Sequence, residues 1–147
     1  MASGKNRDDM FIKDEDIAKN EAWSLLIDSS KSLERSSETL KATAICLAET
    51  ANNVMGSRRW GMFAFSDKLQ CIKFYDEPYD RDAKARIGGL RQEGLSHIPD
   101  AMRAVRWLAT DFLRDRNYII VVSDGIPSGY PGIEEEFLKS IKEAGRL

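Results

Sequence analysis

An aspartate and two serines, each separated by one residue, follow an apolar run near the start of the chain. The segment reads Leu25-Leu26-Ile27-Asp28-Ser29-Ser30-Lys31-Ser32. This spacing places the oxygens of Asp28, Ser30 and Ser32 on one side of a turn. Carboxylate and hydroxyl oxygens suit a hard cation such as Mg²⁺. Aspartate and serine are equally favoured at helix N-caps, so this segment alone leaves both interpretations open.

A second aspartate ends another apolar run about ninety residues later. There Ile119-Ile120-Val121-Val122 leads into Ser123-Asp124-Gly125. In open α/β sheets, ligands bind outside the carboxyl ends of the strands. If both runs are parallel strands, Asp28 and Asp124 meet at one edge of the sheet, and we expect the function to lie there.

The periodicity of apolar residues predicts the elements that must position these side chains. Residues 22–27 suit a strand buried on both faces, and an apolar stripe predicts a helix over 33–54. Strands at 60–65 and 69–75 are joined so closely that they must be antiparallel, and Lys73 is typical of an edge strand. Helices are predicted at 81–90, 99–115 and 133–144, and a strand at 118–123. This order predicts an α/β fold: a Rossmann-like, open, mostly parallel sheet flanked by helices, with one antiparallel edge strand.

The composition places the chain in a broad class. It has 147 residues, 42% hydrophobic and 31% charged, with a formal net charge of −2, which fits one globular domain and gives no sign of nucleic-acid binding. No apolar run approaches the roughly 20 residues that a membrane span requires. We expect a cytoplasmic protein, with a flexible charged lead-in at residues 1–20 and the domain at 21–147. Cysteines and tryptophans are expected in the packed interior: Cys46, Cys71, Trp23, Trp60 and Trp107.

Three segments carry a family resemblance. Asp28-x-Ser30-x-Ser32 resembles the DxSxS signature of the von Willebrand factor A domain, which carries a metal-ion-dependent adhesion site. The family's G-x-T-x-x-G-x-A-[LI] pattern is similar to Gly94-Leu95-Ser96-His97-Ile98-Pro99-Asp100-Ala101-Met102, and its (T/S)-D-G turn is similar to Ser123-Asp124-Gly125. The resemblance implies that Mg²⁺ or Mn²⁺ is bound by Asp28, Ser30, Ser32, Ser96 and Asp124. The chain departs from the family pattern at Ser96, in place of threonine, at Pro99, in place of glycine, and at Lys31, in place of a small or apolar residue.

The tract 80–106 is similar to a bacterial and archaeal subgroup that includes nitric-oxide-reductase activation proteins and cobalt-chelatase subunits. This implies a non-enzymatic protein–protein interaction module, whose cation docks an aspartate or glutamate of a partner. In that subgroup such domains work with AAA+ ATPases of the MoxR or chelatase type, in complex maturation or metal insertion. We expect Lys31, His97 and Tyr130 on the rim that contacts the partner, together with the turn at Ser66 and Asp67.

Family members usually continue past the helix that follows the DG turn, with at least one more strand and helix. The resemblance therefore implies a C-terminally truncated domain. We expect a sheet in which the strands follow the order third, second, first, fourth. Its fourth strand would be an exposed apolar edge, and such edges promote self-association.

Two alternatives remain. One is a Mg²⁺-dependent hydrolase or phosphatase, for which His97, the single histidine, is the candidate base. Against it, the chain has no G-x-S-x-G motif, and Ser30 stands where a haloacid-dehalogenase-type phosphatase has its second aspartate. The other alternative is a scaffold whose metal site is silent. We expect no catalytic activity.

Overall fold

The computed structural model describes residues 20–124 and 128–145, so the predicted lead-in lies, except for Asn20, outside the described residues. The elements in chain order are β1 (Glu21–Asp28), η1 (Lys31–Ser36), α2 (Ser37–Met55), β2 (Trp60–Phe65), β3 (Leu69–Lys73), α3 (Arg81–Gly88), α4 (Ile98–Leu108), η2 (Thr110–Phe112), β4 (Arg116–Val122) and α5 (Ile133–Ala144). Here η denotes a 3₁₀-helix.

The described strands form one sheet in the order β3-β2-β1-β4. Strand β1 pairs in parallel with β2 and with β4, whereas β3 pairs antiparallel with β2. The register aligns Ile27 with Val122 and Asp28 with Phe65, so β1, β2 and β4 end at the same level. The predicted fold class and strand order are confirmed.

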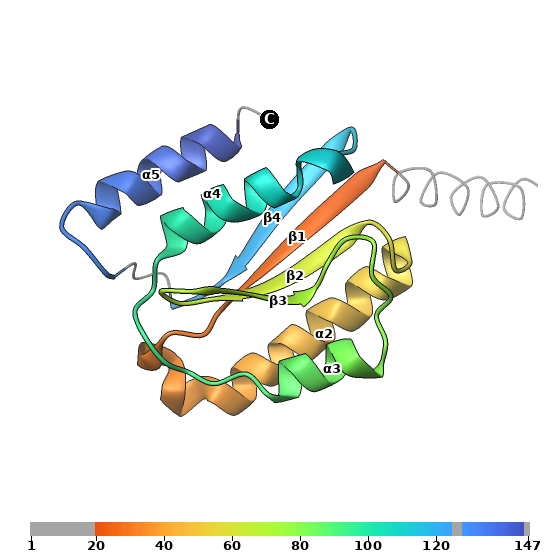
Figure 1. Cartoon of the computed structure of the whole chain (residues 1–147), viewed down its shortest axis with the longest axis horizontal. Helices are drawn as coiled ribbons and strands as arrows, with labels where there is room; N and C mark the ends of the chain where they lie inside the picture. The colour runs from red at the N-terminus through yellow and green to blue at the C-terminus, as the bar shows by residue number, and fades with distance from the viewer. Residues whose placement is uncertain (1–19, 125–127, 146–147) are drawn as a thin grey trace, which may run out of the picture.

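Helices cover both faces of this sheet, with α2 and α3 on one side and α4 and α5 on the other (Figure 1). Because side chains alternate along a strand, Leu25 and Ile27 of β1 pack with α2, while Leu26 packs with α4. These two apolar layers clamp β1 at the centre of the sheet, which fixes the position of its carboxyl end.

The predicted helix over 99–115 is too long. Helix α4 ends at Leu108, and the 3₁₀-turn η2 follows, which places the ring of Phe112 in a stacked contact with Tyr75 at 5.1 Å between centroids. The predicted helix over 33–54 likewise starts as the 3₁₀-helix η1 and becomes α-helical only at Ser37. Apolar spacing marks the buried face of each segment but does not show where tertiary contacts tighten a turn.

The expected burial of Cys46, Cys71 and Trp107 is wrong. Both cysteines are exposed and the Trp107 side chain is 77% exposed, whereas Trp60 is fully buried. Helix α4 buries its residues at positions 98, 101, 102 and 105, and Trp107 lies off that face. Residue type alone therefore predicted the wrong environment at these positions.

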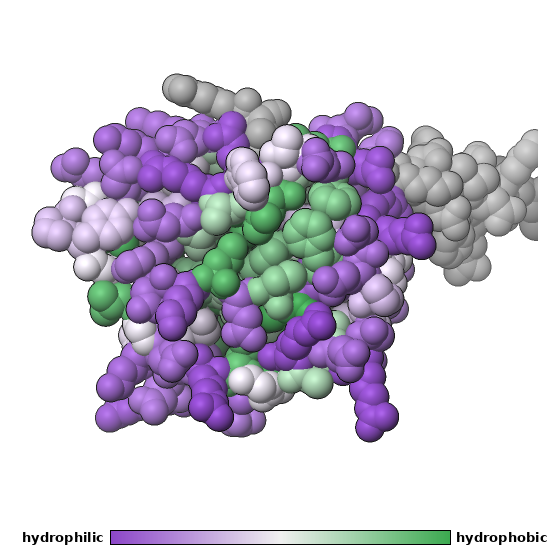
Figure 2. Space-filling view, viewed as in Figure 1, coloured by the Kyte–Doolittle hydropathy of each residue, from purple (hydrophilic) through white to green (hydrophobic). Residues whose placement is uncertain are grey.

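The surface facing the viewer in Figure 2 has an apolar area at its centre, between the two helical layers and framed by hydrophilic side chains. The helices thus leave part of the apolar interior open on this side. Within the described residues, no helix is both long enough and apolar enough to cross a membrane.

Candidate metal centre

Three loops meet at the carboxyl edge of β1 and β4. The loop after β1 and the loop before α4 are joined by backbone hydrogen bonds, from the N–H of Lys31 to the carbonyl of Gly94 at 3.0 Å and from the N–H of Glu93 to the carbonyl of Ser29 at 2.9 Å. The third loop follows β4 and begins with Ser123. Backbone pairing therefore sets the relative positions of the first two loops independently of any side chain in the centre.

The carboxylate of Asp28 lies at the bottom of this centre and is fully buried. Its Oδ1 accepts the backbone N–H of Ser30 at 2.9 Å, and its Oδ2 accepts the hydroxyls of Ser96 at 2.9 Å and Ser123 at 2.6 Å. Among the described residues, no Lys, Arg or His nitrogen lies within 4.0 Å of this carboxylate. A buried carboxylate is costly without a positive partner, and here only neutral donors face it.

A chain of hydroxyls links this buried carboxylate to an exposed one. Ser30 Oγ lies 3.1 Å from Ser32 Oγ, and the Ser32 hydroxyl donates to Asp124 Oδ2 at 2.9 Å. Ser30 and Ser96 are each 1% exposed, whereas Ser32 and Asp124 are exposed. The structure thus brings Asp28, Ser30, Ser32, Ser96 and Asp124 into one network that opens to solvent at one end.

Ser123 also belongs to this network, although the amino-acid sequence suggested no role for it beyond the turn motif. Its hydroxyl donates to Asp28 Oδ2 and lies 3.5 Å from Asp124 Oδ1, so it bridges the two carboxylates. The signal was the hydroxyl residue directly before the aspartate of the (T/S)-D-G turn. Its orientation toward Asp28 depends on the pairing of β4 with β1, which a local motif does not contain.

Helix capping is the alternative interpretation of these serines, and the geometry of Ser30 does not fit it. Ser30 occupies the N-cap position of η1, with φ −71° and ψ 159°, but its side chain makes no capping hydrogen bond. Its hydroxyl instead faces Ser32. Helix capping therefore does not account for these side chains.

The donor set fits a hard divalent cation. It offers two carboxylates and several hydroxyl oxygens, each with lone pairs available when the hydroxyl hydrogen rotates away. Among the described residues, no group of three or more His, Cys, Asp or Glu side chains is placed to hold a metal ion. A cation here would depend on serine hydroxyls, which favours Mg²⁺ or Mn²⁺ over soft metals.

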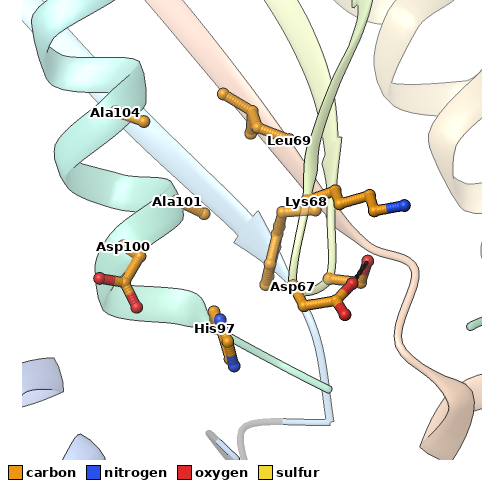
Figure 3. A pocket seen from close by; sticks show the side chains of 9 residues that line it. Asp67, Lys68, Leu69, His97, Asp100, Ala101 and Ala104 are labelled. Atoms are coloured by element: carbon orange, nitrogen blue, oxygen red, sulfur yellow. Dashed lines mark hydrogen bonds between the residues drawn. The ribbon is translucent and has the colours of Figure 1, made fainter. Parts of the chain in front are cut away.

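Of the predicted rim residues, Ser66, Asp67 and His97 line a neighbouring cavity of about 200 Å³, whereas Lys31 and Tyr130 are not part of its lining. Figure 3 shows His97 and Asp100 at the start of α4 on one side of it, and Asp67 and Lys68 from the β2–β3 turn on the other. The His97 ring meets the Tyr130 ring edge-on at 5.7 Å between centroids, and the Tyr130 hydroxyl donates to Asp100 at 3.1 Å. Lys31 is exposed. Residues 125–127, which follow Asp124, lie outside the described residues.

No hydrogen bond connects the His97 side chain to the described serines of the network. Its Nε2 is buried and has no hydrogen-bond partner within the described part of the chain, and a Cβ added to Gly129 would lie 2.1 Å from that atom. The close approach of the Gly129 backbone to His97 explains why glycine suits this position, where φ is +149°.

Comparisons with known proteins support the fold. The chain is similar to a crystal structure of three N-terminal domains of the type V pili tip protein Mfa5 from Porphyromonas gingivalis, with a TM-score of 0.63 and 13% identity over 73% of this chain and 20% of that one. It is also similar to the vWF domain of the same protein, with a TM-score of 0.57 and 15% identity over 73% of this chain and 38% of that one. No family model and no curated protein sequence matches the chain. The likeness establishes a fold of the von Willebrand factor A type.

Proposed function

We propose that this chain is a protein-interaction module that binds Mg²⁺ or Mn²⁺ at the candidate metal centre and docks a carboxylate of a partner protein. The observation that carries the proposal is the fully buried Asp28 carboxylate, which among the described residues is contacted by neutral donors alone and which a hydroxyl chain connects to the exposed Asp124. A divalent cation would supply the missing positive charge. Asp28, Ser30, Ser32, Ser96 and Asp124 would hold it.

The chemistry of such a centre favours anionic partners. Three of its five proposed side-chain ligands are neutral hydroxyls, so a bound cation keeps much of its attraction for a further oxygen anion. Without the cation, an incoming carboxylate would meet the negative charges of Asp28 and Asp124, which repel it most strongly where water is partly excluded. Binding of the partner should therefore require the metal.

The arrangement supports binding more than catalysis. The serines of this network donate to each other or to carboxylates that we propose as cation ligands, so none of these hydrogen bonds pairs a serine with a histidine base. The one histidine of the chain lies against Tyr130 and Gly129. We therefore propose that this module binds its partner without catalysing a reaction.

The sequence resemblance to the subgroup of nitric-oxide-reductase activation proteins and cobalt-chelatase subunits narrows the proposed partner. An AAA+ ATPase of the MoxR or chelatase type is the partner class that this resemblance favours, in a cytoplasmic setting. Acidic side chains on the docking surface of such an ATPase would provide the ligand for the cation.

A pull-down from native lysate tests the proposal. The intact chain should retain a partner in Mg²⁺ and release it in EDTA, and an Asp28→Asn variant should retain none in either buffer. A partner held equally in both buffers would show that the metal centre is not the docking surface. Binding of a purified AAA+ ATPase of the MoxR or chelatase type to the chain, measured in the same two buffers, would identify the partner class.

A further inference from the structure

A second pocket of about 300 Å³ adjoins the candidate metal centre. We call it the basic pocket, and its polar lining consists of Ser29, Ser66, Lys68, Gln70, Arg91 and Glu93. Ser29 lies between the proposed ligands Asp28 and Ser30, and Arg91 belongs to the same loop as Ser96. The two sites therefore share both of the loops that backbone hydrogen bonds join.

The lining of the basic pocket carries a net positive charge, whereas the chain as a whole is net negative. Its lining carries two cations, Lys68 and Arg91, and one anion, Glu93, in a chain whose formal net charge is −2. Both cations are exposed, and among the described residues neither has an ion pair within 4.0 Å or a side-chain hydrogen bond. Guanidinium and ammonium groups that lack partners beside a cavity favour an anionic ligand.

The opposite side of the β2–β3 turn has the reverse charge. The cavity there is lined by Asp67 and Asp100 and also by Lys68, whose ammonium Figure 3 shows directed away from the cavity. An acidic segment that reaches the metal centre would therefore be repelled on the side of α4. It would be attracted on the side of Lys68 and Arg91.

We propose that the basic pocket is a second recognition subsite, which binds another acidic side chain of the partner segment whose first carboxylate reaches the cation. The inference rests on the proposed function and adds the chemistry of the partner: a segment with two acidic residues close together in sequence. The metal gives the first contact its strength, and Lys68 with Arg91 selects among segments that offer a carboxylate.

Short synthetic peptides test this subsite on the full chain in saturating Mg²⁺. One series has the form acetyl-Gly-Asp-(Gly)n-Glu-Gly-amide, with one to three central glycines. The matched series has glutamine in place of the glutamate, so that only the second charge differs. Surface ion pairs contribute roughly 0.2–1 kcal/mol each, so the best glutamate peptide should bind the wild type about three- to tenfold more tightly than its glutamine partner.

The double variant Lys68→Gln/Arg91→Gln should bind both series with the affinity of the glutamine peptides. Its stabilisation by Mg²⁺ should equal that of the wild type, because neither side chain contacts the proposed ligands. The exposed Arg81, at the start of α3, provides the control variant Arg81→Gln, which should keep the preference for glutamate. Equal affinities for the two series in the wild type, or a preference that survives in the double variant, would overturn the subsite. Absence of stabilisation by Mg²⁺ in the wild type would instead contradict the proposed metal centre.

Discussion

Lys73 shows how one residue can connect several elements of this fold. Its ammonium is fully buried and donates to the carbonyls of Ser57 at 2.6 Å, Trp60 at 2.8 Å and Phe74 at 3.0 Å. It also lies 4.4 Å from the centroid of the Trp60 ring. The side chain therefore joins the loop before β2, the start of β2 and the end of β3, with a cation–π contact in addition.

Replacement of Lys73 by methionine should destabilise the domain. Methionine keeps most of the volume but leaves three carbonyls without their donor, and each such loss costs about 1–3 kcal/mol when the group stays buried. We expect a total loss of roughly 2–4 kcal/mol in urea unfolding, since some carbonyls will reach water. The exposed Lys142 provides the matched control: Lys142→Met should change stability by less than about 0.5 kcal/mol. Equal effects of the two substitutions would contradict this role.

The pH dependence of stability should also report on Lys73. Burial lowers the pKa of this lysine to about 8, against the opposing influence of the Glu77 and Asp76 carboxylates, whereas its ordinary value is 10.5. Between these two pH values the unfolded chain binds more protons than the folded one, so the contribution of this group to stability rises with pH.

Relative to Lys73→Met, the wild type should therefore gain stability between about pH 8 and pH 10.5. The gain should be on the order of 2–3 kcal/mol over the whole window. Urea unfolding of both proteins at several pH values measures it. A difference that stays constant or shrinks with rising pH would be inconsistent with a lysine whose charge is penalised by burial.

At the scale of single residues, the sequence predicted which side chains meet at the sheet edge better than it predicted which side chains are buried. The convergence of Asp28 and Asp124 follows from two apolar runs that lead into aspartate. The parallel register of β1 and β4 brings the carboxyl ends of these runs to the same edge of the sheet. The burial of Lys73 and the exposure of Trp107 were not predictable from residue type. Both depend on which side of an edge strand or a short helix the neighbouring elements happen to cover.

At the scale of elements, the loop between α3 and α4 is the segment that completes the candidate centre. It carries Ser96 and contains Gly94, whose φ is +74°. A Cβ at Gly94 would lie 2.6 Å from Asp67 Oδ1. Glycine suits this position because of its backbone conformation, and an added Cβ would also press against the Asp67 carboxylate of the β2–β3 turn.

The substitution Gly94→Ala should therefore destabilise the domain by about 1–2 kcal/mol, because an L-residue in this region is strained. It should also weaken binding of Mg²⁺, since the carbonyl of Gly94 accepts the N–H of Lys31 between two proposed ligands. Gly88, in α3, provides the control: its φ is not positive, and an added Cβ meets nothing within 4 Å. Gly88→Ala should leave stability unchanged or slightly improved, as measured by urea unfolding. An equal cost at both positions would refute the argument for Gly94.

The regular elements were largely predictable, because apolar spacing in β1, β2, α4 and α5 records which face meets the core. Helix α4 begins at Ile98, one residue before its predicted start. The 3₁₀-turns η1 and η2 were missed. They arise where the chain must redirect a few side chains toward contacts distant in sequence, such as Phe112 toward Tyr75.

At the scale of the whole molecule, β4 forms an apolar edge of the described sheet. Residues Ile119–Val122 are all partly exposed, and a cavity of about 420 Å³ separates β4 from α5. Ile141 of α5 lines this cavity and is 46% exposed. Unpaired backbone groups beside apolar side chains promote association through the edge.

We predict that the isolated chain self-associates through this edge. Sedimentation velocity or size exclusion over a concentration series should show a concentration-dependent species larger than the monomer. The substitution Ile141→Lys places a charge beside the edge and should raise the concentration needed for association at least about tenfold, which corresponds to roughly 1.4 kcal/mol. Val54→Lys, at a similarly exposed apolar residue of α2, should have no such effect. A monomer at every concentration would contradict this prediction.

The order of the strands was predictable from the short β2–β3 connection and the helical crossovers, which permit few arrangements. The position of α5 relative to β4 was not predictable, because periodicity shows which face of an element is apolar but not the distance between two packed elements. For the same reason the sequence contained no sign of the basic pocket, whose lining comes from three separate segments of the chain.

Thermal unfolding in Mn²⁺ or Mg²⁺ tests the metal centre most directly. A ligand that binds only the folded state stabilises it by about 2.7 kcal/mol at a hundredfold excess over its Kd, so the Tm of the wild type should rise by roughly 5–10 °C. Asp28→Asn keeps the shape of the buried side chain but removes its charge, and should abolish the rise. Asp111→Asn, at an exposed carboxylate in η2, should keep it. A wild type that shows no rise, or a rise equal to that of Asp28→Asn, would contradict a cation bound at this carboxylate.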